Sequence, residues 1–96
     1  MKKILFITGK LAEKGLKTVI DSIEDKKFSY EIRNLNVNVA ALLTTDMIER
    51  RIGDVNGFDE IIIPGRVRGD IKSLEKQLSK TITRGPDELK DLQLLF

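Results

Sequence analysis

Two arginines and an aspartate lie close together in the middle of the chain, on a loop between two apolar segments. Arg66 and Arg68 follow an apolar run at residues 61–63, and Asp70 precedes an amphipathic segment that begins at Ile71. Guanidinium groups bind phosphate and carboxylate oxygens in pairs, and the N-terminus of a helix favours negative charge. The order of strand, basic loop and helix therefore predicts an anion site.

Other polar or glycine-containing segments follow the remaining apolar runs. The carboxyl ends of parallel strands meet at one edge of an open α/β sheet, where ligands usually bind. We therefore expect a basic pocket for phosphate or carboxylate at this edge. The candidate ligand-binding residues are Gly9, Lys10, Thr44, Thr45, Gly65, Arg66, Arg68, Gly69, Asp70 and Arg84.

Several of these residues also have a plainer structural interpretation. Thr44 or Thr45 could cap the helix that follows, and Asp70 could cap the next one. Gly9 could only permit a turn, and Lys10 could be a solvated surface charge. Both interpretations stay open at the level of the sequence.

The composition excludes several kinds of chemistry within the chain. It contains no cysteine and no histidine, so thiolate nucleophiles, histidine bases and Cys/His metal sites are absent. The glycine spacing of a phosphate-binding loop is also missing around Gly9 and Lys10. We expect no metal and no cofactor, and no catalytic residue can be named.

The hydrophobic pattern predicts four strands that alternate with helices. Apolar runs or β-rich segments at residues 4–8, 29–35, 59–63 and 81–83 indicate strands, and the second alternates as an edge strand does. Helical spacing follows each of them, the last helix beginning at Pro86. Residues 36–41 fit either a longer strand or a loop. The fold class is α/β: a single domain over residues 1–96, a small open three-layer α/β/α sandwich with a mostly parallel four-stranded sheet of order 2-1-3-4, Rossmann- or flavodoxin-like.

Charge and hydropathy limit the partners. A net charge of +2 gives no broad footprint for nucleic acid. The apolar run that begins at Ile4 stops at Thr8, too early for a signal peptide or a membrane span. We expect a cytoplasmic protein that binds neither nucleic acid nor membrane, and a homodimer stays open.

Four segments of the chain resemble the N-terminal domain of archaeal dihydropteroate synthase-related proteins. They lie in the same order at residues 7–13, 39–45, 64–70 and 84–92. The resemblance implies a fragment of a larger protein that carries a dihydropteroate synthase-like transferase barrel and is linked to tetrahydromethanopterin, and hence pterin, biosynthesis. The chemistry would belong to the barrel.

The expected function is therefore that of an accessory domain, ligand-binding or regulatory, with a phosphate-bearing small molecule in the basic pocket. The alternative is a structural domain that docks against the barrel of the same chain or against a partner subunit, with no small-molecule ligand. An independent enzyme is the least favoured hypothesis, because no base and nucleophile stand at a suitable spacing.

Overall fold

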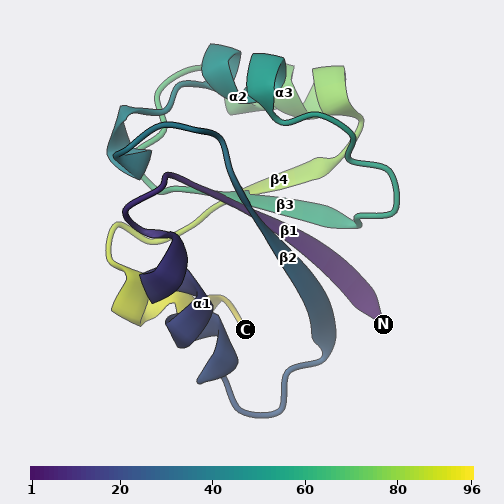
Figure 1. The fold of residues 1–96 in the computed structure, drawn as a ribbon. Helices are drawn as coiled ribbons and strands as arrows, with labels where there is room; N and C mark the ends of the chain where they lie inside the picture. The colour runs from purple at the N-terminus through teal and green to yellow at the C-terminus, as the bar shows by residue number, and fades with distance from the viewer.

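The computed structural model describes all residues from 1 to 96, and four strands alternate with helices along the chain (Figure 1). The elements are β1 (Lys2–Thr8), α1 (Glu13–Asp21), β2 (Phe28–Asn34), the 3₁₀ helix η1 (Ala40–Leu42), α2 (Thr45–Arg51), β3 (Glu60–Ile63), α3 (Ile71–Leu78), β4 (Thr81–Arg84) and the 3₁₀ helix η2 (Leu89–Leu95).

The four strands form one sheet in the order β2-β1-β3-β4, and every pair of neighbours is parallel. The predicted fold class and strand order are confirmed. In the register, Leu5 of β1 lies between Glu31 of β2 and Ile61 of β3. The chain leaves β1 toward β2 on one side and returns to β3 on the other, so the topological switch point lies between β1 and β3.

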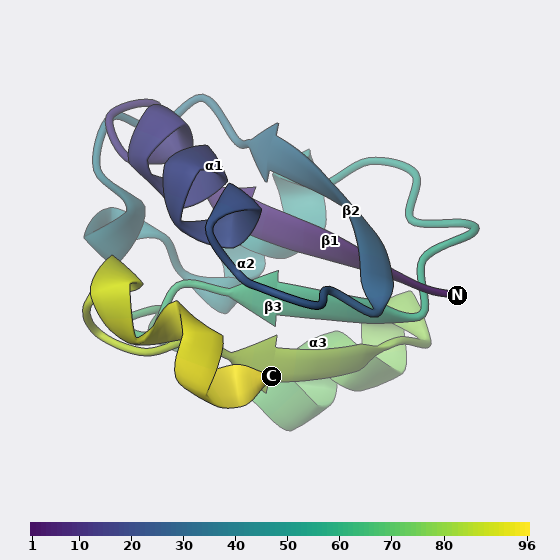
Figure 2. The same cartoon turned by 90° about the horizontal axis from the view of Figure 1, so that it is seen from below.

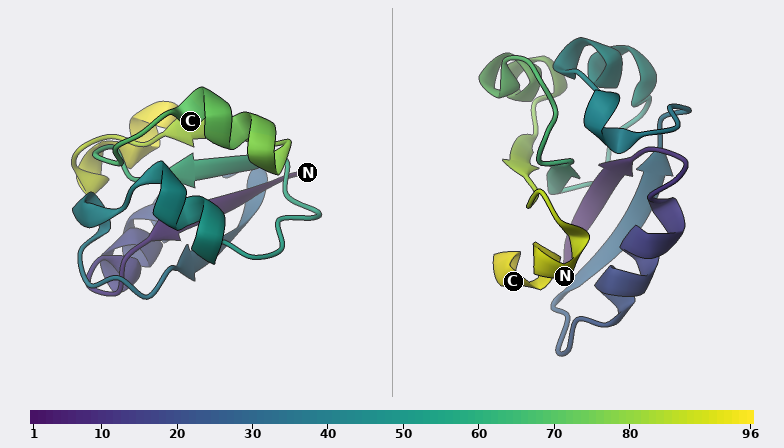
Figure 3. Two further views of the ribbon diagram at one scale, coloured as in Figure 1. Left: turned by 90° about the horizontal axis from the view of Figure 1, so that it is seen from above. Right: turned by 90° about the vertical axis from the view of Figure 1, so that its left-hand side faces the viewer.

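Helices cover both faces of the sheet. Viewed from above and edge-on, α2 and α3 lie on one side and α1 and η2 on the other (Figure 3). Alternate residues of β1 enter two separate cores: Leu5 and Ile7 face α2 and α3, whereas Ile4 and Phe6 face α1 and η2. Because both faces of β1 are buried, its sequence is a continuous apolar run rather than an alternating one.

The core under α1 and η2 is the smaller of the two, with 8 buried residues against 13. Seen from below, α1 and the C-terminal segment lie beside each other across this face (Figure 2). On this face of the sheet, α1 is accompanied only by the short 3₁₀ helix η2. This thin cover leaves room for a cavity on the same face, described below.

The C-terminal helix differs from its prediction. It begins at Leu89 rather than Pro86 and is a 3₁₀ helix. Its leucines at 89, 92 and 95 recur every third residue, which matches the three residues per turn of a 3₁₀ helix. Leu92 is buried, and Phe96 stacks on Phe28 with 4.6 Å between ring centroids.

The structure also decides the alternatives for residues 36–41, which form a loop and part of η1 rather than a longer strand. The loop is tied to the turn after β1 by two backbone hydrogen bonds. The N–H of Lys10 donates to Val37 O at 2.7 Å, and that of Leu11 donates to Asn38 O at 3.1 Å.

Candidate functional site

A cavity of about 170 Å³ lies at the carboxyl edge of the sheet, where β1 and β3 end. It occupies the switch point at which ligands of open α/β sheets bind. Its lining is mostly apolar. It comes from the ends of β1 and β3, from the N-terminal part of α1, from η1, and from the segment after β4. The lining residues include Thr8, Leu16, Ile62, Gly65, Arg66 and Leu92.

The deep wall of the cavity is the face of the sheet that packs under α1 and η2. Ile4 and Phe6 of β1 point to this face, and strand alternation places Thr8 there next. Phe6, Thr8 and Ile62 all line the cavity. A hydroxyl group therefore ends an otherwise apolar row of side chains.

The Thr8 side chain is the buried polar group of the cavity. Thr8 is 3% exposed, and its hydroxyl takes part in none of the side-chain hydrogen bonds of the protein. No fully enclosed side-chain oxygen or nitrogen lacks a partner, so the Thr8 oxygen keeps some accessible surface, and Thr8 lines the cavity. A buried hydroxyl of this kind is costly unless a bound molecule or water completes its hydrogen bonds.

The loop that follows β3 supplies the cationic group of the cavity. Arg66 lines it, together with Gly65 and Pro64. The loop turns sharply, because the N–H of Val67 donates to Pro64 O at 3.2 Å, and Val67 itself is buried. The backbone N–H groups of Gly65 and Arg66 donate to no other protein atom. The loop that borders the cavity therefore carries two backbone N–H groups without a protein acceptor and one guanidinium.

One acidic residue also lines the cavity. Asp87 lies in the segment between β4 and η2, and its side chain is in no ion pair. With Arg66 as the one basic lining residue, the charged groups of the cavity are a single cation and a single anion.

Of the ten predicted site residues, Gly65 and Arg66 line the cavity and the other eight do not. Two of the eight cap helices. The Thr44 hydroxyl accepts from Met47 N at 3.2 Å at the start of α2, and Asp70 accepts from Ser73 N at 3.1 Å at the start of α3. The capping interpretation of both residues is correct.

Three more of the predicted residues bring loops into close contact. A Cβ atom on Gly9 would lie 2.8 Å from Ala40 N and from Val37 O. Gly69 has φ +124° and packs against the buried Thr45, whose Oγ1 a Cβ atom would overlap. The close contacts hold neighbouring turns of the carboxyl edge together, and positions 9 and 69 require glycine for that reason.

The remaining three cations do not join Arg66 in the cavity. Lys10 and Arg68 are exposed on its outside, and Arg68 pairs through its backbone with Thr44. The guanidinium of Arg84 donates from Nη1 to Gly65 O at 2.8 Å and to Val67 O at 2.6 Å. The predicted four-cation pocket is therefore reduced to Arg66, which is also exposed but lines the cavity. The guanidinium of Arg84 binds backbone carbonyls instead.

Sequence reasoning missed Thr8 and the apolar wall built by Leu16, Leu89 and Leu92. Thr8 carried a weak signal, since it is the polar residue that closes the buried run of β1. The leucines carried none, because a cavity wall and a packed core use the same residue types.

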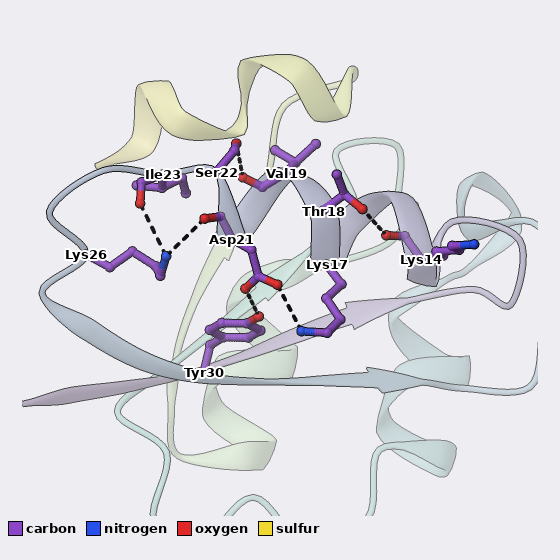
Figure 4. A network of polar contacts seen from close by, with 9 residues as sticks. All are labelled: Lys14, Lys17, Thr18, Val19, Asp21, Ser22, Ile23, Lys26 and Tyr30. Atoms are coloured by element: carbon purple, nitrogen blue, oxygen red, sulfur yellow. Dashed lines mark hydrogen bonds and ion pairs between the residues drawn. The ribbon is translucent and has the colours of Figure 1, made fainter.

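A second polar cluster lies away from the cavity, between α1 and β2 (Figure 4). Asp21 accepts from the Tyr30 hydroxyl and from Lys17 Nζ, the latter at 2.9 Å. The hydrogen bond from Tyr30, followed by that from Lys17, lowers the pKa of Asp21. The hydrogen bond to Asp21 raises the pKa of Tyr30 and that of Lys17. These exposed groups link α1 to the edge strand and do not touch the cavity.

The structure offers no metal site and no membrane-spanning helix. No three acidic, cysteine or histidine side chains gather closely enough to hold an ion. None of the helices has the length and apolar character needed to cross a bilayer.

Comparison with known proteins places the chain in a family. Uncharacterized protein MJ0107 of Methanocaldococcus jannaschii is 29% identical over 104 aligned residues, which cover 98% of this chain and 19% of that protein. The chain thus spans less than a fifth of the length of this relative. No solved structure matches the chain. The profile of a family of unknown function, DUF6513, matches residues 2–87, and the chain belongs to this family.

Proposed function

We propose that this chain is an accessory ligand-binding domain whose cavity takes a compact organic anion bearing a phosphate or carboxylate group. The observation that carries the proposal is Thr8, a residue that is 3% exposed, lines the mostly apolar cavity, and has a hydroxyl group without a hydrogen-bond partner in the protein. A polar group kept in an apolar wall gains its hydrogen bond when a ligand is present.

The anionic group of the ligand would lie against the loop after β3. Arg66 supplies a guanidinium, and Gly65 and Arg66 supply backbone N–H groups with no protein partner. Charge-assisted hydrogen bonds to a phosphate or carboxylate are stronger than neutral ones. Arg66 is the one basic lining residue and Asp87 the one acidic one, so the cavity suits a single anionic group placed at Arg66 rather than a chain of phosphates.

The body of the ligand would be apolar and small. Leu16, Ile62 and Leu92 line the cavity, so a ligand gains by removing apolar surface from water. An apolar cavity of about 150 Å³ holds one benzene ring, and this cavity has about 170 Å³. It fits a single ring with a substituent, and a larger ligand would have to extend past Arg66 into solvent.

The wider setting follows from the resemblance of the four sequence segments. We propose that the domain belongs to a cytoplasmic protein with a dihydropteroate synthase-like barrel, in pterin biosynthesis, and that the domain binds while the barrel catalyses. The matched relative is about five times as long as the aligned region, which leaves room for further domains in that protein.

The proposal is tested by NMR titration of the 96-residue chain with phenyl phosphate, inorganic phosphate, ribose 5-phosphate and a pterin phosphate. Arg66→Ala removes charge-assisted contacts, each about 1.5 to 3 kcal/mol, so phenyl phosphate should bind roughly 10- to 150-fold more weakly. Thr8→Val should cost about 3- to 10-fold, the loss of one neutral hydrogen bond. Arg68→Ala, which removes the same charge outside the cavity, is the matched control.

Inorganic phosphate should bind more weakly than phenyl phosphate, because it gains nothing from the apolar wall. If none of the four compounds shifts the amide signals of Thr8 and Arg66, the cavity is not an anion site.

A second candidate function is docking, which an exposed apolar patch favours. Leu11, Val39 and Leu42 are 77%, 43% and 70% exposed and lie on the two hydrogen-bonded turns outside the cavity. In this case the patch would contact the barrel or a partner subunit. Leu11→Asp and Leu42→Asp should then weaken association within the longer protein and leave phenyl phosphate binding unchanged.

A further inference from the structure

The side chain of Arg84 reaches across from β4 to the loop that carries Arg66. Its Nη1 atom donates to two carbonyl oxygens, Gly65 O at 2.8 Å and Val67 O at 2.6 Å. These carbonyls stand on either side of Arg66 in the sequence. Arg84 itself does not line the cavity, although Gly85, which follows it, does.

The backbone at Arg84 is held in place by the sheet. Arg84 is the last residue of β4 and pairs with Ile63 in the parallel register. Just beyond it, the N–H of Gly85 donates to Ile63 O at 2.8 Å. The guanidinium therefore extends from the rigid end of the sheet to an irregular loop.

Besides Arg84, the loop is restrained by the close packing of Gly65 against Gly85 and Pro86 and by the hydrogen bond from Thr45 N to Arg68 O at 2.8 Å. Its internal hydrogen bond runs from Val67 N to Pro64 O, and Arg68 N donates to Leu43 O at 3.4 Å. The N–H groups of Gly65 and Arg66 have no partner. Two carbonyl oxygens that converge on one point repel each other unless a donor lies between them, and Arg84 provides that donor.

Arg84 has no acidic partner that would account for it otherwise. It is absent from the four ion pairs of the protein. Its side-chain contacts are the two carbonyls, and together they hold the 65–66 and 67–68 peptide groups of the loop that carries Arg66.

We propose that Arg84 is a positioning residue of the anion site: it holds the Gly65–Val67 backbone so that the Arg66 guanidinium and the free N–H groups of Gly65 and Arg66 face one bound anion. This inference rests on the proposed function. It assigns to Arg84 an indirect role, in place of the direct ligand contact that the sequence predicts.

The test compares Arg84→Gln and Arg84→Lys with Arg68→Gln as the charge-matched control. Arg84→Gln should weaken phenyl phosphate binding about tenfold, the lower end of the cost of losing a supporting residue at a metal site. Arg84→Lys keeps an ammonium that can donate to both carbonyls, so it should restore most of the affinity. Arg68→Gln removes an equal charge from the same loop and should have little effect.

A second measurement needs no ligand. The ¹⁵N relaxation of the Arg66 and Val67 amides should show increased motion in Arg84→Gln and not in Arg84→Lys or Arg68→Gln. A Gly15→Ala background keeps the variants folded where necessary, because alanine adds helix stability in α1.

Unchanged amide motion in Arg84→Gln overturns the inference, and so does an equal loss of affinity in Arg68→Gln, which would reveal a general charge effect. If phenyl phosphate fails to bind the wild-type chain, the proposed function fails, and the relaxation data still decide whether Arg84 holds the loop.

Discussion

Replacing Gly65 by alanine should separate two walls of the cavity and destabilise the fold. A Cβ atom at this position would lie 2.6 Å from Gly85 O and 2.9 Å from Pro86 C and O. Real Cβ atoms do not approach backbone atoms so closely, and both partners are backbone atoms of a turn that cannot rotate away. The loop after β3 and the turn after β4 must therefore move apart.

The cost can be placed within limits. Extra atoms forced into a packed site cost about 1 to 3 kcal/mol. For a domain of this size, 1 kcal/mol changes the unfolding midpoint by roughly 4 to 8 °C. We expect Gly65→Ala to lower the midpoint by about 4 to 24 °C. Phenyl phosphate binding should weaken as well, because the displaced loop carries Arg66.

Gly15→Ala is the matched control, since it makes the same chemical change in a helix. A Cβ atom at Gly15 would meet only the Leu89 Cδ1 atom, at an ordinary 3.6 Å. Alanine is favoured over glycine in a helix by about 0.5 to 1 kcal/mol, so this variant should unfold at a midpoint about 2 to 8 °C higher. Differential scanning calorimetry of both variants gives the comparison. Equal midpoints for Gly65→Ala and wild type would refute the close packing of the two turns.

Three further predictions concern the framework of the site. Burial raises the pKa of Glu60, but hydrogen bonds from Lys2 and Thr83 outweigh it and hold the pKa below the ordinary value of 4.5. The stabilisation is therefore complete above pH 4.5 and is lost as the pH falls through the lower folded-state pKa, and Glu60→Gln should flatten the loss of thermal stability measured on this acid side. Asp70→Ala should cost about 0.5 to 2 kcal/mol in urea unfolding, because it removes the cap of α3, without changing phenyl phosphate affinity. Leu92→Ala should cost about 2 kcal/mol or more in the same assay, because Leu92 is 2% exposed. Asp70→Ala and Leu92→Ala should each also lower the midpoint of thermal unfolding. A change in phenyl phosphate affinity in Asp70→Ala would show that Asp70 belongs to the site after all.

The fold could be predicted closely from the sequence because its signals are local and repeated. The continuous apolar run of β1 requires cover on both faces, and the alternation in β2 requires one exposed face. Alternating strands and helices then leave few arrangements of a parallel sheet. The type of the C-terminal helix could not be predicted in this way, because leucines at 89, 92 and 95 fit both an α-helical stripe and a 3₁₀ helix.

The candidate site could be predicted only in part. The predicted strand ends indicated that a site would lie at the carboxyl edge of the sheet, and the loop that carries Arg66 does border the cavity there. The partners of the other polar side chains were not predictable, because a threonine or aspartate before a helix can equally cap it or bind a ligand. Thr44 and Asp70 both cap.

The sequence by itself determined the α/β class, the strand order and the edge at which polar groups collect, since hydrophobic period and chain connectivity decide these. The tertiary structure alone decided which groups meet there. Arg66 and Arg84 are the same residue type at the same edge, yet one lines the cavity and the other donates to two carbonyls. The physical reason is that a side chain's partners depend on where loops distant in the sequence are brought together, and neither periodicity nor propensity records those distances.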